Sequence, residues 1–196
     1  MPRNNSQEEK RIHILQALDQ CLREKPFDRT SIKDIARAAG VNHGLLHYYF
    51  KGKDDILLNY IDYTIDHYLS MFDHWYREKS LEGTDEKLFL KEFFEFLNDR
   101  ITLNHSLSKV FIEIWEIAAY NPEVKSKLQK AYSQWADVLS VMLTRSMKNR
   151  ETAEKTGMAI VAFHEGVSLL TVLMDSKTID FKNVLTVFQK TIIDML

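Results

Sequence analysis

Residues 30–53 read TSIKDIARAAGVNHGLLHYYFKGK, and this stretch decides the fold. Ser31 and Asp34 have the spacing of a capping box, which predicts that a helix begins there. Gly40 comes after an apolar, small-residue face and tolerates the positive φ that ends a helix and turns the chain. Val41 then restarts an apolar pattern at helical spacing. Two short helices, residues 31–39 and 42–48, therefore form a helix-turn-helix, whose second helix is built to lie in the major groove of DNA.

The charge distribution agrees with this reading. The whole chain carries a formal net charge of −2, but residues 1–53 contain ten Lys and Arg against six Asp and Glu. The remaining residues contain 16 Lys and Arg against 22 Asp and Glu. A basic head on an acidic body is the pattern expected when the head faces phosphates.

The rest of the chain also reads as helices. Apolar residues recur at helical spacing over residues 7–23, 54–79, 84–103, 107–118, 122–147, 152–174 and 180–196, and no stretch has the period of a strand. Pro26 ends the first of these helices, while Asn121 and Pro122 give a strong start signal. Breaks are expected at residues 81–83, with Thr84 as the following cap, and at residues 148–150. The sequence therefore predicts an all-α protein of nine helices, with a three-helix head and a helical body.

Two features bear on the compartment. Cys21 is the only cysteine, so an intramolecular disulfide is excluded, and a reducing cytosol fits. No apolar core of a signal peptide follows Met1. The longest apolar stretch, residues 158–174, carries His164 and Glu165 and is shorter than the ~20 residues that a membrane span needs. We expect a cytoplasmic protein that does not enter the membrane.

The segments Thr30–Ala36, Ala39–Val41 and Gly44–Lys53 closely resemble the helix-turn-helix of the TetR family of bacterial transcriptional repressors. The motif covers the first quarter of the chain, and the length and the nine-helix layout also fit the family. Residues 115–132 show a faint similarity to the choline-responsive, BetI-like branch. The resemblance implies a DNA-binding domain at residues 7–53 and a ligand-binding and dimerisation domain at residues 54–196.

Positions in the motif divide the candidate DNA contacts into two groups. Asn pairs bidentately with adenine and Lys with guanine, while a glycine lets the helix approach the bases closely. The expected base-reading residues are Lys33, Asn42, His43, Gly44 and His47. The two histidines depart from the Lys and Tyr that are more usual in the family, which leaves the operator sequence open. The expected phosphate contacts, which carry no sequence information, are Thr30, Ser31, Tyr48, Tyr49 and Lys53. Tyr49 could equally belong to the core, where Phe50 is expected.

The resemblance also implies a small-molecule pocket in the body. For each candidate wall residue, ordinary core packing is the alternative. Glu113 and Glu116 flank an aromatic residue, a combination that suits a cation, although their spacing also lets one of them face water. The candidate pocket residues are Phe93, Phe94, Phe96, Phe111, Trp115, Glu116, Tyr132, Trp135, Met142, Phe163 and His164. The identity of the effector stays open.

The family forms homodimers through its last two long helices, here residues 152–174 and 180–196. Beyond Gly157 the first of these helices is apolar nearly all round, and such a helix needs burial on all sides. The alternative is that it forms the core of a single chain. The expected interface residues are Phe163, Val167, Leu170, Met174, Val184 and Phe188.

Taken together, these features predict a ligand-responsive transcriptional regulator, most simply a repressor. It would bind a palindromic operator in double-stranded DNA as a dimer, and a small-molecule effector would release it. The alternative is a DNA-binding regulator controlled by a protein partner without a small effector. An enzyme is less favoured, because no Ser/His/Asp order, Gly-rich phosphate loop or H-E-x-x-H motif is present. The sequence predicts no catalytic residue, cofactor or metal ligand.

Overall fold

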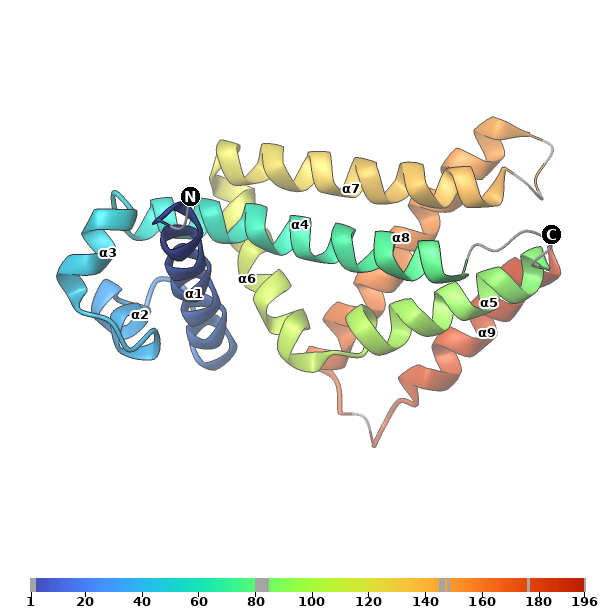
Figure 1. The fold of residues 1–196 in the computed structure, drawn as a ribbon. Helices are drawn as coiled ribbons and strands as arrows, with labels where there is room; N and C mark the ends of the chain where they lie inside the picture. The colour runs from blue at the N-terminus through green and yellow to red at the C-terminus, as the bar shows by residue number, and fades with distance from the viewer. Residues whose placement is uncertain (1–2, 80–84, 145–146, 148, 176, 196) are drawn as a thin grey trace. The chain divides into compact units, whose positions relative to one another are not determined.

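The computed structural model describes residues 3–79, 85–144, 147, 149–175 and 177–195, and within these ranges every regular element is a helix. The all-α fold that the sequence predicts is confirmed. The elements, in chain order, are α1 (Arg3–Glu24), α2 (Ile32–Ala38), α3 (His43–Tyr49), α4 (Lys53–Lys79), α5 (Glu86–Leu97), a π-helical turn η1 (Asn98–Thr102), α6 (His105–Tyr120), α7 (Pro122–Leu143), α8 (Arg150–Leu173) and α9 (Phe181–Asp194) (Figure 1).

The chain divides into two compact units. Unit 1 consists of Met1–Phe72 with Glu113–Lys127, and unit 2 consists of Asp73–Ile112 with Leu128–Leu196. By their bounds, α4, α6 and α7 each contribute residues to both units. These packing units do not coincide with the predicted division at residue 53, which concerns function and stays a prediction.

The helix-turn-helix of unit 1 forms as its local signals predict. The Ser31 hydroxyl accepts a hydrogen bond from the Asp34 backbone N–H at 3.1 Å, and the Asp34 carboxylate accepts one from the Ser31 N–H at 2.9 Å. Lys25 also pairs with Asp34 at 2.8 Å, and it is the main reason that the pKa of this carboxyl lies well below its usual range. Gly40 turns the chain with φ of 59°. Asn42 then caps α3 by accepting from the Gly44 N–H at 2.7 Å.

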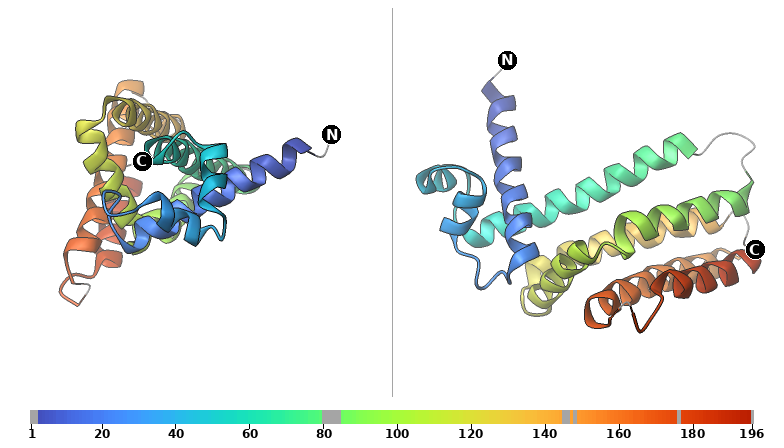
Figure 2. Two further views of the ribbon diagram at one scale, coloured as in Figure 1. Left: turned by 90° about the vertical axis from the view of Figure 1, so that its left-hand side faces the viewer. Right: turned by 90° about the horizontal axis from the view of Figure 1, so that it is seen from below.

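Helix α1 holds the motif against α4 (Figure 2). Asp19 on α1 accepts a hydrogen bond of 2.6 Å from the Tyr60 hydroxyl on α4 and pairs with Arg23. Burial raises the pKa of Tyr60, so its hydroxyl keeps its proton and remains a donor. Cys21 is buried in the same layer and serves as a small core side chain. The fully buried side chains of unit 1 include Ile14, Leu18, Ile35, Leu46, Ile56 and Ile61.

Residues 113–127 join unit 1 through specific polar contacts. Glu113 on α6 accepts a hydrogen bond from the backbone N–H of Phe27, in the loop between α1 and α2. Lys127 on α7 pairs with both carboxylate oxygens of Asp62 on α4 at 2.7 Å. Glu113 is therefore committed to a backbone group of the head, which removes it from the predicted acidic–aromatic ligand site.

In unit 2, helix α9 packs beside α5 and α8 (Figures 1 and 2). Its inner face brings Phe181 and Leu185 against Val167 of α8, and Phe163 stacks on Phe188 with ring centroids 3.7 Å apart. By length and composition α8 is the one described helix apolar enough to cross a membrane, a criterion that core helices of soluble proteins also meet. Only 28% of its apolar window is buried within the chain.

Helices α7 and α8 are in close contact at Gly157. A Cβ atom at this position would lie 2.9 Å from the Ala136 carbonyl oxygen and 3.1 Å from the Ser140 nitrogen. Both atoms belong to the backbone of α7, so they cannot move aside as a side chain would. The absence of a side chain at Gly157 is what permits this crossing.

We expect Gly157→Ala to destabilise the protein by about 1–2 kcal/mol. Overpacking costs about 1–3 kcal/mol, and the better helix propensity of alanine returns at most about 1 kcal/mol. The melting temperature should fall by about 2–4 °C per kcal/mol for a chain of this size. The matched control is Gly52→Ala, because a Cβ at Gly52 meets no atom within 4 Å. Equal melting temperatures for the two variants would contradict the close crossing.

The structure differs from the sequence prediction at several helix ends. Helix α1 begins at Arg3 rather than residue 7, and Asp85 rather than Thr84 caps α5. The predicted break at residues 81–83, Thr84, Lys148 and Leu196 lie outside the described residues. The π-helical turn at residues 98–102 was not predicted. It allows Asn98 to exchange two hydrogen bonds with Gln189 of α9, and it places Thr102 against α8.

Candidate functional site

The predicted base-reading residues share an exposed surface on unit 1. Asn42, His43, Gly44 and His47 belong to α3 or its cap, and Lys33 lies on α2; all five are exposed. The opposite side of α3 is fixed by Leu46, which is 1% exposed, and by the Phe50 cap, which is 3% exposed. The helix is thus anchored on one side and free on the other, as a groove-reading helix requires. The role of each residue in reading bases stays a prediction.

His43 and His47 form a pair on this surface. Their ring centroids lie 4.9 Å apart with an interplanar angle of 78°, an edge-to-face arrangement. The pair lies one helical turn apart, so both rings project from the same side of α3.

Some of the predicted phosphate contacts are exposed, whereas others are buried or already hydrogen-bonded within the chain. Ser31 is exposed, and Tyr48 is 67% exposed with its hydroxyl accepting from Gln7 at 3.1 Å. Tyr49 is half-buried. The prediction for Thr30 is wrong: this residue is 1% exposed, and its hydroxyl donates to the Pro26 carbonyl, so its side chain belongs to the loop that precedes α2.

Lys53 already has an internal partner. Its ammonium group donates to the Phe27 carbonyl at 2.8 Å and lies 4.1 Å from the centroid of the Phe27 ring. An ammonium group has three protons, so a phosphate contact through the others is compatible with this bond. Phe27 is therefore held on both backbone groups, its N–H by Glu113 and its carbonyl by Lys53.

Among the predicted pocket residues, the aromatic residues of α5 belong to a packed core. Phe93 and Phe94 are at most 1% exposed. Trp75 of α4 contacts Phe93 and Phe96, with ring centroids 5.6 Å and 5.3 Å apart. These rings fill space against each other, so the prediction that Phe93 and Phe96 line a ligand site gains no support from their geometry.

His164 of α8 is the buried residue that packing leaves incompletely satisfied. It is 6% exposed, its Nδ1 lies 2.8 Å from the Thr102 hydroxyl, and its ring stacks on Phe94. Its Nε2 atom has no hydrogen-bond partner in the described part of the chain. Burial lowers the pKa of His164 to about 4, so the ring is neutral at physiological pH. A buried polar atom without a partner costs free energy, and a ligand group could remove that cost.

Glu165, the next residue on α8, was not predicted as a site residue. It is half-buried, and burial raises its pKa to about 7, while hydrogen bonding from Tyr132 of α7 opposes the shift. None of the ion pairs among the described residues includes Glu165. Carboxyls with perturbed pKa values and no ion-pair partner are candidates for ligand contacts. The sequence did hold a signal, an acidic residue inside the apolar run 158–174.

We expect Glu165→Gln to raise the melting temperature by an amount that grows as the pH rises from about 4.5 to about 7 and that levels off above pH 7. The carboxyl ionises near pH 4.5 in the unfolded chain but only near pH 7 in the folded protein, so the wild type loses stability between these values. Glutamine has no such titration. His164, whose pKa falls from 6.5 to about 4, acts in the opposite sense but is present in both proteins.

Thermal melts of both proteins from pH 4.5 to 8 would measure this difference. Glu116→Gln is the matched control, because Glu116 is exposed on α6. A melting-temperature difference between Glu165→Gln and wild type that stays constant with pH would contradict the burial of this carboxyl.

The remaining pocket predictions have mixed outcomes. Met142 is buried in unit 2, while Phe111, Tyr132, Trp135 and Phe163 are half-buried there. Trp115 is half-buried and belongs to unit 1. Glu116 is exposed, so it does not line an enclosed pocket.

Some of the predicted dimer residues are packed within the chain, and others are exposed. Val167 is 4% exposed in the core cluster with Phe181 and Leu185, so its assignment to an interface is wrong. Phe163 and Phe188 stack on each other within the chain. In contrast, Leu170, Met174 and Val184 expose 40%, 39% and 40% of their surfaces.

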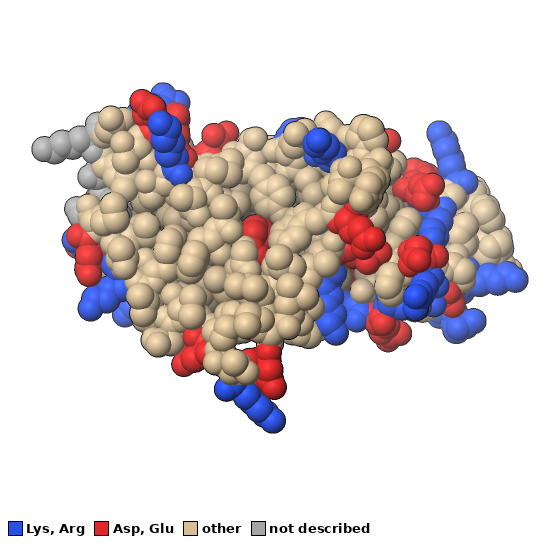
Figure 3. Space-filling view, turned by 180° about the vertical axis from the view of Figure 1, so that it is seen from behind, with Lys and Arg blue, Asp and Glu red and all other residues tan. Residues whose placement is uncertain are grey.

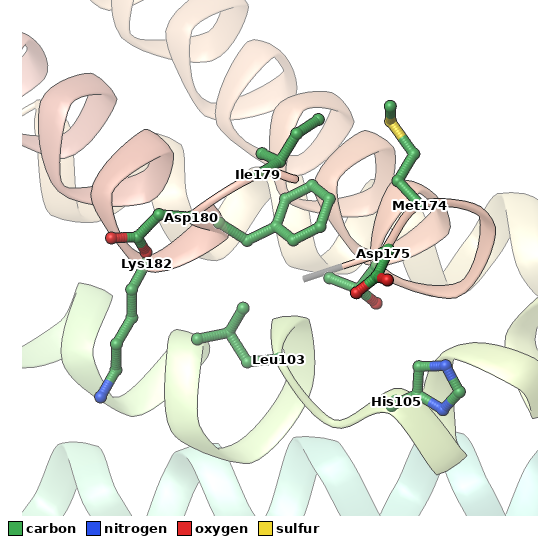
Figure 4. A pocket seen from close by; sticks show the side chains of 9 residues that line it. Leu103, His105, Met174, Asp175, Ile179, Asp180 and Lys182 are labelled. Atoms are coloured by element: carbon green, nitrogen blue, oxygen red, sulfur yellow. The ribbon is translucent and has the colours of Figure 1, made fainter. Parts of the chain in front are cut away.

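Two hollows lie on unit 2. One, of about 750 Å³, is bounded by the segment after η1 and by the α8–α9 connection, with His105, Asp175 and Lys182 at its edge (Figure 4). Asp180 caps α9 by accepting a hydrogen bond from the Asn183 N–H, and Asp175 accepts one from the Lys177 N–H in the connection that precedes α9, so both carboxylates have local structural roles. The other, of about 790 Å³, runs between α5 and α9 and mixes Lys and acidic side chains. No three His, Cys, Asp or Glu side chains among the described residues gather to hold a metal ion.

Comparison with known proteins shows that this chain is similar to bacterial transcriptional regulators. A model described as bacterial regulatory proteins of the tetR family matches residues 14–60, and one described as the C-terminal domain of LmrA/YxaF-like transcriptional regulators matches residues 89–179. The fatty acid metabolism regulator protein of Bacillus subtilis is 23% identical over 145 residues, which cover 74% of this chain and 72% of that protein. The regulator BetI 1 of Chromohalobacter salexigens is 21% identical over 169 residues, which cover 86% and 82%.

Solved structures share the fold. A transcriptional regulator from Saccharomonospora viridis, solved in complex with choline, superposes with a TM-score of 0.78 at 20% identity, covering 93% of this chain and 96% of the other. FadR from Bacillus subtilis, solved with stearoyl-CoA, has a TM-score of 0.71 at 17% identity, covering 94% and 98%. At these identities the likeness shows the fold alone.

Proposed function

Because this chain belongs to the TetR family of transcriptional regulators, we propose that it is a cytoplasmic repressor that binds a palindromic operator as a homodimer. The observation that carries the proposal is the exposed surface of α3. Asn42, His43, Gly44 and His47 face solvent while Leu46 and Phe50 anchor the helix from behind. Lys33, Ser31 and Tyr48 flank this surface and supply groups for bases and phosphates.

The dimer proposal is supported by the surface of α8 and α9. One stripe of α8 is buried within the chain, including Gly157, Ile160 and His164, while most of its apolar window is not. The side chains left exposed on the two helices include Leu170, Leu173, Met174, Val184 and Val187. On the face drawn in Figure 3, most charged side chains lie toward the ends and edges, and the broad area between them is largely uncharged. A second copy that packs its α8 and α9 on this surface would bury the exposed stripe.

The effector proposal is supported by His164 and Glu165. The unpartnered Nε2 of His164 can hydrogen-bond one ligand group, and the unpaired carboxyl of Glu165, next to Tyr132, can hold a cation. Solved proteins with this fold hold choline in one case and stearoyl-CoA in another. These two molecules are therefore the first effectors to test, and the Glu165 carboxyl favours the cationic one.

The mechanism that we propose is linkage between the two sites. The operator favours a dimer whose two α3 helices are spaced by about one DNA turn, ~34–36 Å. An effector that prefers another spacing shifts the population away from DNA. Couplings of about 1–3 kcal/mol are typical and weaken binding about 5- to 150-fold. Helices α4 and α6 each contribute residues to both units. A shift of either helix would therefore connect the effector site to the DNA-binding helices.

Selection of bound fragments from a random DNA pool tests the proposed function. We expect an inverted repeat with half-site centres about one DNA turn apart, ~10 base pairs. Choline and stearoyl-CoA would then be added to the protein–operator complex, and release would be followed by fluorescence anisotropy. Failure to enrich any sequence would overturn the proposal that the protein binds a specific operator. A dimer that binds an operator but that no small molecule releases would point instead to control by a protein partner.

A further inference from the structure

A histidine pair on α3 has the geometry of a metal chelate. His43 and His47 are four residues apart on one helix, and their ring centroids lie 4.9 Å apart. Residues at this spacing have Cβ atoms about 5–6 Å apart, which lets two imidazoles reach one ion. Two histidines at i and i+4 on one helix face are also the zinc-binding element of the H-E-x-x-H motif.

Both rings are available for coordination. Both side chains are exposed, and neither ring has a hydrogen bond or ion pair with another described residue. Other histidines of the chain are engaged: the His13 ring lies 3.0 Å from the Ala39 carbonyl, and His164 contacts Thr102. His74 pairs with Glu78 at 3.3 Å. The pair on α3 therefore differs from these in having two free imidazoles side by side.

We propose that His43 and His47 bind one divalent metal ion of the imidazole-preferring class, such as Zn²⁺ or Ni²⁺, on the DNA-reading face of α3. Neutral imidazole suits these ions, whereas Mg²⁺ prefers oxygen ligands. The described part of the chain supplies no third His, Cys, Asp or Glu, so water fills the remaining coordination positions. The metal is held by two protein ligands and exchanges with the solvent.

The metal prevents operator binding, a consequence that rests on the proposed function. Coordination occupies one of the two ring nitrogens of each histidine, both of which would otherwise be free to hydrogen-bond base edges. It also places an ion with its water shell beside Gly44, where the absence of a side chain would otherwise allow close approach to DNA. Metal binding and base reading therefore compete for the same two side chains and for the same space beside Gly44.

Calorimetric titration of the untagged, full-length protein with ZnCl₂ and with NiCl₂ tests the site without DNA. We expect one ion per chain, no binding of MgCl₂, and a loss of at least about tenfold in affinity, about 1.4 kcal/mol, in His43→Gln and in His47→Gln. His74→Gln is the matched control, since it removes an exposed histidine that has a carboxylate at i+4. Unchanged affinity in both α3 variants, or an equal loss in His74→Gln, would overturn the assignment.

Fluorescence anisotropy with a selected operator fragment tests the competition. Operator affinity measured in EDTA examines the proposed function alone. Saturating Zn²⁺ should then weaken operator binding at least about tenfold in the wild type and in His74→Gln, and this effect should be absent in His43→Gln. Operator affinity that is unchanged or strengthened by Zn²⁺ would overturn the competition, even with the metal site confirmed by calorimetry.

Discussion

Leu170→Glu is expected to turn the dimer into monomers and to lower operator affinity by at least about a hundredfold. Leu170 is 40% exposed in the single chain, so the substitution leaves the fold of one subunit intact. In the proposed dimer it would place an unpaired carboxylate in an apolar interface, where burial of a charge is strongly unfavourable. In a dimer, the two DNA-binding domains bind the two half-sites together, which can raise the overall affinity by about 10²–10⁴-fold. A monomer loses this gain.

Sedimentation velocity and operator titration would measure these two effects together. Val141→Glu is the matched control, because Val141 on α7 is also apolar and is 64% exposed, yet it lies outside the proposed α8–α9 interface. This control should sediment as a dimer and keep its operator affinity. A dimeric Leu170→Glu protein would refute the assignment of the interface to this stripe of α8.

Gly44→Leu should weaken operator binding by about a hundredfold, or about 2.8 kcal/mol, while leaving the dimer intact. Gly44 lies on the exposed side of α3, and a Cβ there would contact only the Asn42 side chain, at 3.4 Å. Because Gly44 is exposed, the rest of the leucine side chain can extend into solvent in the free protein. DNA does not, because the added atoms would hold the helix away from the base edges that it must reach.

Gly44→Ala provides a graded comparison, since one methyl group should cost less affinity than a leucine side chain. Thermal melts and sedimentation of both variants would establish that folding and dimerisation are unaffected. Full operator affinity in Gly44→Leu would mean that this part of α3 does not approach the bases, and the base-reading assignments of His43 and His47 would fail with it.

The head was predictable because its signals are local. The capping box of Ser31 and Asp34, the positive φ at Gly40 and the cap at Asn42 each depend on residues within about one helical turn, and the structure has all three. The exposure of Asn42, His43 and His47 follows from the apolar period that buries Leu46. These caps and turns depend only on neighbouring residues, so they form however the rest of the chain packs.

Predictions failed where long-range packing decides between chemically similar residues. Thr30 has the polarity of a phosphate ligand, but the loop after α1 folds its hydroxyl back onto Pro26. Glu113 was grouped with Glu116 as a cation site, yet it holds the backbone of Phe27, 86 residues away in sequence. Glu165 was overlooked because its significance lies in having no charged partner, which no local pattern records.

Helix α8 shows most clearly which features follow from local sequence and which depend on tertiary packing. Its apolar composition alone indicates that most of its surface must leave water, because a helix apolar on every side has no face suited to solvent. Composition cannot say which side chains meet their own chain. Val167 packs against Phe181 and Leu185 while Leu170, one turn further, stays exposed, because the position of α9 covers one stripe of α8 and not the next. Local sequence thus specifies the helices, their caps and the reading motif, whereas the burial of each side chain depends on contacts between segments that only folding brings together.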